Sequence, residues 1–340
     1  MKHIGMDLHS TTTDICVRNG VGRIVLQRRI ETKPKELETF ILGVSGEKRV
    51  AVEESQMADW VSRLLAPHVK EVIRSQPRHN RLISGSEDKC DEKDAAALSE
   101  LLFMNRLKPV HHPPAAYRAL REGVIAYWIA SRELTRAKNR LKAFFLYNGW
   151  HQVGRAVYCL RNREKNLQAI EKRGWNVGLA KLHYEQLDHC RRLKAKHVRM
   201  LREMCKPMMR PVKCLASIPG IGPIGAYTLL AYLEDGRRIP NKRKLWRYAG
   251  LSLRRHESND KGKQGASHSG NRMVKQVLMS AAITVVSRQE DNALAQYWEA
   301  GIRQNVDAKR MRRNLARKIA VIAHLLLRSN QEYRDERVMV

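Results

Sequence analysis

The sequence lacks paired cysteines and long apolar runs. Its six cysteines are scattered, with no CxxC pair, so a zinc ribbon or a disulfide framework is disfavoured and a reducing cytosol is expected. No apolar run reaches the roughly 20 residues that a membrane span needs. Asp7 and His9 interrupt the N-terminus early, so no signal peptide is expected there. These absences predict a cytoplasmic protein with no membrane partner.

Acidic residues are few relative to basic ones. The chain has 64 Lys and Arg against 34 Asp and Glu, a formal net charge of +30. Such a surplus costs stability through self-repulsion unless a polyanion neutralises it. Nucleic acid is the expected partner, because neutralised phosphates release their counterions. A ribosomal or histone-like binder would share this signature, so charge alone does not indicate an enzyme.

The basic surplus is concentrated in the back of the chain. Residues 1–113 hold 18 Lys and Arg and 16 Asp and Glu, whereas the remaining 227 residues hold 46 and 18. The segment His111-His112-Pro113-Pro114 breaks the chain between the two parts. We therefore expect domains at 1–113, 114–210 and 211–340, with the acids of the first concentrated for a purpose.

The front part has the pattern of an α/β domain. Apolar patterning and turn residues predict strands at 3–8, 11–17, 22–30, 48–53 and 69–73, and helices at 34–43, 56–66 and 91–102. Three consecutive strands followed by helix, strand, helix and strand are the order of a ribonuclease-H-like sheet. Many α/β domains share parts of this order, so it favours the fold without proving it.

The rest of the chain has a mostly helical pattern. Residues 115–207 fit two long helices that fold back on each other, a spacer or oligomerisation arm. Further helices are expected at 226–234, 241–249, 271–287, 291–303 and 308–328, with a polar loop at 256–270. The last helix has one strongly basic side, which favours a phosphate-facing role over a merely solvated face: Lys309, Arg310, Arg312, Arg313, Arg317 and Lys318.

Four carboxylates form the most specific pattern. Asp7 and Glu53 end the first and fourth expected strands, and Asp91 and Asp94 open a helix on one of its faces. Four converging acids repel one another unless a cation resolves the conflict. Mg²⁺ or Mn²⁺ favours carboxylate oxygens, and two such ions would clamp the oxygens of a phosphoryl transfer.

Three of the four acids also have a purely structural interpretation. Asp7 would be a strand-end cap, Glu53 half of a surface salt bridge, and Asp91 a helix N-cap. Their placement on matching elements of one fold type favours the metal site. Glu54 and Asp88 are nearby competitors that we rank lower.

Two further patterns lie in the basic part. Ile218-Pro219-Gly220-Ile221-Gly222 resembles the hairpin of a helix-hairpin-helix, in which Gly220 and Gly222 let the backbone approach a phosphate. A plain tight turn between helices is the alternative. In the polar loop, Ser258 is flanked by cations that would stabilise charge on a phosphate, although loop serines are common: Arg254, Arg255, Lys261 and Lys263.

In this order, the motifs resemble the DEDD transposases of the insertion-sequence family numbered one hundred and ten, relatives of Piv-type DNA invertases. The resemblance covers about residues 3–328 and rests on the following matches: Ile4 to Asp7, Val50 to Glu53, Lys89 to Ala95, Leu215 to Gly222, Tyr248 to Leu251, and Arg254 to Ser258. The chain departs from the usual pattern after Glu53, where Glu54-Ser55-Gln56-Met57 replaces Ala-Thr-Gly-aromatic, and after Ser258.

The resemblance implies a RuvC-like domain, a coiled-coil arm and a C-terminal transposase domain. It further implies that Ser258 is the nucleophile that links covalently to DNA. The magnesium site of Asp7, Glu53, Asp91 and Asp94 would lie beside it, from another subunit of a dimer or tetramer. Donor and target DNA would be paired through a structured noncoding bridge RNA, and the protein would work on the bacterial nucleoid.

Two other functions remain open. A Holliday-junction-type endonuclease would use the same acids to hydrolyse DNA without a serine. A non-catalytic nucleic-acid-binding protein would use only the basic part, and would need neither the acids nor magnesium.

Overall fold

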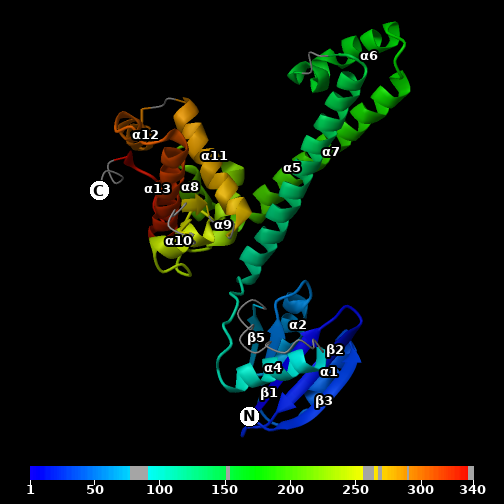
Figure 1. Ribbon diagram of the computed structural model, residues 1–340, viewed down its shortest axis with the longest axis vertical. Coiled ribbons are helices and arrows are strands. Elements are labelled where there is room, and N and C mark those ends of the chain that lie inside the picture. Colours follow the sequence, from blue (N-terminus) through cyan, green and yellow to red (C-terminus); the bar gives the residue numbers. More distant parts are fainter. Residues whose placement is uncertain (77–90, 151–153, 256–263, 267–269, 289–290, 336–340) are drawn as a thin grey trace. The chain divides into compact units, whose positions relative to one another are not determined.

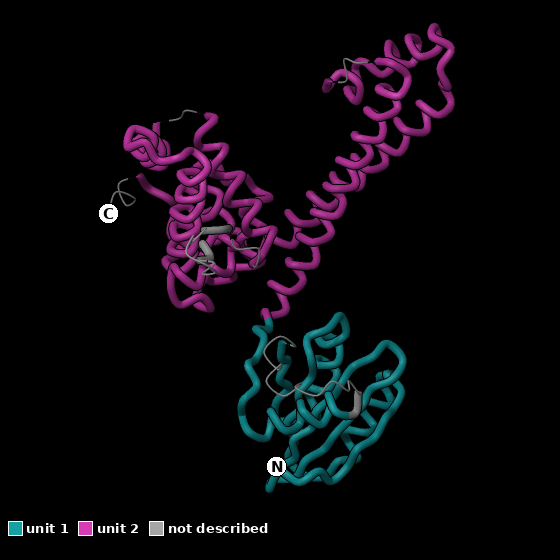
Figure 2. The backbone as a smooth tube through the Cα atoms, in the orientation of Figure 1, with its two compact units in different colours: residues 1–112 teal, residues 113–340 magenta. Residues whose placement is uncertain are grey.

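The computed structural model describes residues 1–76, 91–150, 154–255, 264–266, 270–288 and 291–335. These residues form two compact units, Met1–His112 and Pro113–Val340, coloured separately in Figure 2. We describe each unit by itself. The boundary lies within the predicted His-His-Pro-Pro break, and the further division expected at residue 210 stays a prediction.

The first unit contains a five-stranded sheet of order β3-β2-β1-β4-β5 (Figure 1). The strands are β1 (Lys2–Leu8), β2 (Thr12–Arg18), β3 (Ile24–Glu31), β4 (Lys48–Glu53) and β5 (Glu71–Ser75). β2 is antiparallel to β1 and β3, whereas β4 is parallel to β1 and β5. The mixed α/β expectation is confirmed, and the order of strands and helices along the chain is the one predicted, which is consistent with a ribonuclease-H-like domain.

Helices cover both faces of this sheet. α1 (Pro34–Gly43) and α2 (Ala58–Leu65) pack on one face over a core that includes Ile4, Met6, Val50 and Val52. α4 (Asp91–Phe103) packs on the other face, where Leu98 and Leu102 meet Ala51 and Ile73. Because side chains alternate along a strand, the odd-numbered residues of β1 and β4 face α4.

One predicted strand begins two residues too early. The segment expected as a strand at 69–73 forms β5 at Glu71–Ser75, after a 3-10 turn at Ala66–His68. Pro67 favours this turn because its ring fixes φ. Pairing with β4 then sets the start, since Glu71 lies opposite Arg49.

The second unit is almost entirely helical. α5 (Ala115–Tyr147) and α7 (Val177–Met204) lie side by side, and the shorter α6 (Arg163–Lys172), which the sequence did not predict, packs against α7. The remaining elements are α8 (Met209–Ala216), α9 (Pro223–Leu233), α10 (Lys242–Tyr248), β6 (Leu253–Arg255), β7 (Gln264–Ala266), α11 (Arg272–Arg288), α12 (Ala293–Arg303) and α13 (Ala308–Ser329).

Two apolar cores stabilise this unit. The larger is built on α8, α9, α11 and α13 and also receives Leu120 and Val124 from the first part of α5. The smaller surrounds Phe145, Ile170 and Tyr184, where α6 meets the long helices. α5 therefore begins in the globular part and continues into the helical pair. No helix among the described residues is both long and apolar enough to cross a bilayer.

Candidate acidic site and nucleic-acid interface

Asp7 and Glu53 lie at one edge of the sheet. β1 and β4 are parallel neighbours, with Met6 opposite Val52, so the next residue of each strand reaches the same edge. By the alternation of side chains along a strand, both residues lie on the face of the sheet that α4 covers. The core under α1 and α2 is on the opposite face. Each is partly buried. The sheet therefore brings these two carboxylates to one place.

α4 runs antiparallel to β1, so the first turn of α4 lies at the same edge of the sheet as Asp7 and Glu53. The ring of Phe103, at the end of α4, lies 5.4 Å from that of His3 at the start of β1. Gly5 lies against the middle of α4, since a Cβ built on it would be 2.2 Å from the Ala95 carbonyl oxygen. Asp91 begins the helix and Asp94 is exposed in its first turn. The side chain of Asp91 lies outside the described part of the structure.

His9 is a contact of the site that the sequence analysis missed. Its Nε2 lies 3.1 Å from Asp7 Oδ2, and a proton on Nε2 makes this contact a hydrogen bond. The signal in the sequence was a histidine two residues after an expected ligand. His9 therefore contacts one carboxylate oxygen of Asp7.

Glu54 is engaged elsewhere. Its Oε2 lies 3.5 Å from Nε of Arg74, whose side chain is 5% exposed and also reaches Asp59 Oδ1 at 3.0 Å. Arg74, the residue before the last one of β5, therefore forms an ion pair with Glu54. The lower rank of Glu54 is consistent with this contact, and Asp88 lies outside the described residues.

Two of the described residues at this edge, Asp7 and Glu53, are carboxylates. Carboxylate oxygens are the donors that Mg²⁺ and Mn²⁺ prefer. Asp14, which lies opposite Asp7 on β2, keeps a buried oxygen, Oδ2, without a hydrogen-bond partner. Among the described side chains, however, no three of His, Cys, Asp or Glu are grouped closely enough to hold an ion. The described side chains alone therefore do not form the predicted four-carboxylate site, which includes Asp91.

The predicted hairpin joins α8 to α9 in the second unit. Gly220 has a φ of +83°, and a Cβ built on it would lie 2.5 Å from the Ala281 carbonyl oxygen of α11. Glycine is required there by the packing of the unit itself. Gly222 precedes α9 and has open space at its Cβ position. Of the two, Gly222 is the position where a phosphate has room to approach.

The segment with the candidate serine is closed at its base. β6 and β7 pair antiparallel, from Leu253 opposite Ala266 to Arg255 opposite Gln264. Just outside this ladder, Gly270 packs so tightly on Gly250 that a Cβ would lie 2.5 Å from the Gly250 nitrogen. Ser258, Lys261 and Lys263 lie outside the described residues, as do the side chains of Arg254 and Arg255.

The basic helix α13 divides into two parts. Lys309 and Arg310 are exposed at its start, and Arg312 and Arg313 are partly buried. Arg317 Nε donates to the Leu251 carbonyl at 2.8 Å, and its guanidinium lies over the Trp246 ring. Lys318 lies over the Tyr297 ring. Burial lowers the pKa of both Arg317 and Lys318, so both cations contribute to the packing of this unit.

Family models match the chain in both of its units. A family model described as a DEDD transposase of the IS110 type matches residues 4–147, and the model of the "Transposase IS116/IS110/IS902 family" matches residues 212–299. A protein of Sinorhizobium fredii, named "Putative transposase y4pF/y4sB", is 31% identical over 144 residues. That match covers 41% of this chain but only 37% of the relative. The two models together span the sheet from Ile4 onward, α4, α5 and the region from within α8 to within α12, and the chain belongs to the IS110 family of DEDD transposases.

Proposed function

We propose that this protein cuts and rejoins DNA strands as the transposase of an insertion sequence. The observation that carries the proposal is the convergence, at one sheet edge, of Asp7, Glu53 and the first turn of α4. The family match supports the reaction class, and the net charge of +30 supports a nucleic-acid substrate.

Asp7, Glu53, Asp91 and Asp94 would hold the Mg²⁺. When bound, the ion supplies electrostatic stabilisation of the phosphate oxygens in the transition state. His9 keeps Asp7 oriented, through the 3.1 Å contact to Oδ2. Gly5 keeps α4 close enough to β1 for its first turn to reach the edge.

Ser258 would be the nucleophile, as the family resemblance implies. Its Oγ would form a bond to a backbone phosphorus while one P–O bond of the DNA breaks. The serine proton leaves, and the released deoxyribose hydroxyl gains a proton. Rejoining reverses the step with another strand's hydroxyl. The β6–β7 ladder and the Gly250–Gly270 contact bring together the described residues on either side of the segment that contains Ser258.

A noncoding guide RNA and a homo-oligomer, a dimer or tetramer, complete the proposal. RNA–DNA pairing would provide the sequence specificity, which leaves the protein to bind backbones through cations. We expect the purified full-length protein to carry a noncoding RNA. Full activity of nucleic-acid-free protein on DNA would contradict the RNA part of the proposal.

The test is the fate of cleavable DNA with three proteins: the native chain, Asp7→Asn and Ser258→Ala. We expect the native chain to form a Mg²⁺-dependent covalent adduct on denaturing gels. Both variants should lose the adduct, and Ser258→Ala should retain Mn²⁺ binding. Full-rate nicking by Ser258→Ala without an adduct would instead indicate a hydrolytic endonuclease. Unchanged behaviour of Asp7→Asn would indicate a protein that only binds nucleic acid.

A further inference from the structure

Asp14 is a buried carboxylate that faces the acidic edge. It lies on β2 directly opposite Asp7 in the antiparallel pair with β1. Directly opposed residues point to the same face of a sheet, and this is the face that α4 covers. The residue is 2% exposed. Asp14 therefore extends the row of carboxylates by one strand, to β2, β1 and β4.

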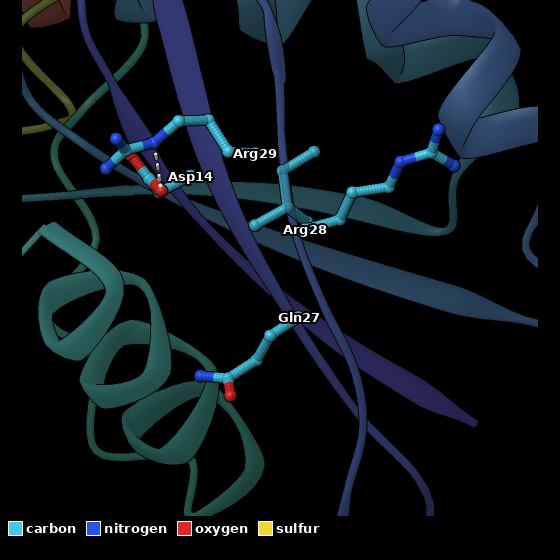
Figure 3. Close-up of a pocket in the computed structure, with 5 residues that line it drawn as sticks. Asp14, Gln27, Arg28 and Arg29 are labelled. Atoms are coloured by element: carbon cyan, nitrogen blue, oxygen red, sulfur yellow. Dashed lines mark hydrogen bonds and ion pairs between the residues drawn. The ribbon is translucent and has the colours of Figure 1, made fainter.

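Only half of this carboxylate is satisfied. Arg29 Nε, on the neighbouring strand β3, donates to Asp14 Oδ1 at 2.8 Å, as Figure 3 shows. Asp14 Oδ2 is buried and has no hydrogen-bond partner. The pocket of about 140 Å³ beside the pair is lined by Asp14, Ile15, Gln27, Arg28 and Arg29. It does not expose Oδ2 to solvent.

The arrangement is unfavourable without a cation. Like charges directly opposite each other on a sheet destabilise it, and a buried acceptor without a partner loses its hydration. The hydrogen bond from Arg29 reaches Oδ1, and the arginine side chain is itself 52% exposed. A purely structural Asp–Arg pair would gain from presenting both oxygens to the guanidinium. Asp14 Oδ2 is therefore left without the donor or cation that a buried carboxylate oxygen requires.

We propose that Asp14 is an outer carboxylate of the metal site, whose Oδ2 faces the cation held at Asp7 through one of the ion's waters. It acts as a positioning residue, with Arg29 fixing its other oxygen. This inference rests on the proposed function, because it requires that Asp7 binds a divalent ion.

The test is Mn²⁺ binding by the full-length protein, followed by electron paramagnetic resonance of the free ion. Asp14→Asn should weaken Mn²⁺ affinity by about ten- to a hundredfold, as loss of an outer carboxylate partner does. Glu54→Gln is the matched control, since that acid is engaged by Arg74, and its affinity should stay within about twofold of the native value. In the absence of metal, Asp14→Asn should melt at the same temperature as the native chain or higher.

Native Mn²⁺ affinity in Asp14→Asn would overturn the inference, and a lower melting temperature without metal would then indicate an ordinary Asp–Arg pair. Asp14→Glu retains the charge and should bind Mn²⁺ more tightly than Asp14→Asn; equal affinities of the two would also overturn it. A native chain that binds no Mn²⁺, or that binds it equally after Asp7→Asn, would refute the proposed metal site itself. The failure of the inference is thus distinguishable from the failure of the function.

Discussion

At Gly5 the absence of a side chain decides how closely α4 approaches β1. A Cβ there would lie 2.2 Å from the Ala95 oxygen and 2.5 Å from the Ser99 nitrogen, and both are backbone atoms of α4. Backbone atoms cannot turn aside as the end of a flexible side chain can. The glycine in the motif Ile4-Gly5-Met6-Asp7 therefore serves the site from two residues away, by holding the helix that begins at Asp91.

We expect Gly5→Ala to lower the free energy of unfolding by about 1–3 kcal/mol, as overpacking does. Mn²⁺ affinity should fall with it, because the displaced helix carries Asp94. Denaturant titration and metal binding measure the two effects. Gly43→Ala, at a position with nothing within 4 Å of the added Cβ, is the control and should unfold as the native chain does. Native stability and Mn²⁺ affinity in Gly5→Ala would refute the proposed role of this glycine.

At the scale of elements, the turn between α8 and α9 connects these two helices and packs against a third, α11. Ile218 and Ile221 are buried in the larger core of the second unit. Gly220 lets the turn contact the backbone of α11 at Ala281, and Gly222 leads into α9 without such a neighbour. The two glycines of this motif therefore differ in their surroundings. Gly220 is required by packing against α11, whereas the Cβ position of Gly222 faces open space.

The variants Gly220→Ala and Gly222→Ala test these two roles separately. Gly220→Ala should lower the free energy of unfolding by at least about 2 kcal/mol, since it combines a left-handed backbone with overpacking. Gly222→Ala should unfold like the native chain but bind duplex DNA more weakly, because its methyl group occupies the space for a phosphate. Denaturant titration and fluorescence anisotropy are the measurements. Equal stability of the two variants would contradict the assignment of Gly220.

For the whole molecule, the excess of charge is carried by residues 114–340, which hold a net of +28 against +2 in the preceding part. Cations that contact phosphates make binding depend on salt. The cations of α13 are not equivalent in this respect, since Arg310 is exposed whereas Arg317 donates to Leu251 and lies over Trp246.

We expect Arg310→Ala to reduce the slope of log affinity for duplex DNA against log salt by about 0.9, the loss of one phosphate contact. Arg317→Ala should leave the slope nearly unchanged but lower the free energy of unfolding by about 1–3 kcal/mol, through the lost charge-assisted hydrogen bond. Lys35→Gln, an exposed cation of the first unit, is the control for the slope. A larger change of slope for Arg317→Ala than for Arg310→Ala would reverse this assignment.

Local patterns were sufficient to predict most elements and the position of two carboxylates at the ends of strands. The apolar runs before Asp7 and Glu53 predict strands with a carboxylate at or next to their last residue, because alternation and residue type are properties of neighbours in sequence. The strand at 69–73 was misplaced because the pairing of Glu71 with Arg49, which sets its start, is not local. The same limit hid α6, whose packing depends on α7.

The sequence by itself determined the family motifs, the distribution of charge and the ends of β1 and β4. Only the tertiary structure decided that α4 runs antiparallel to β1 and that Asp14 lies opposite Asp7. It also decided that Gly220 packs against the backbone of α11 and that Arg317 donates a hydrogen bond to the Leu251 carbonyl. Each of these depends on strand register or helix packing between residues distant in the chain. Such contacts are selected by the burial of whole faces, which no local pattern specifies.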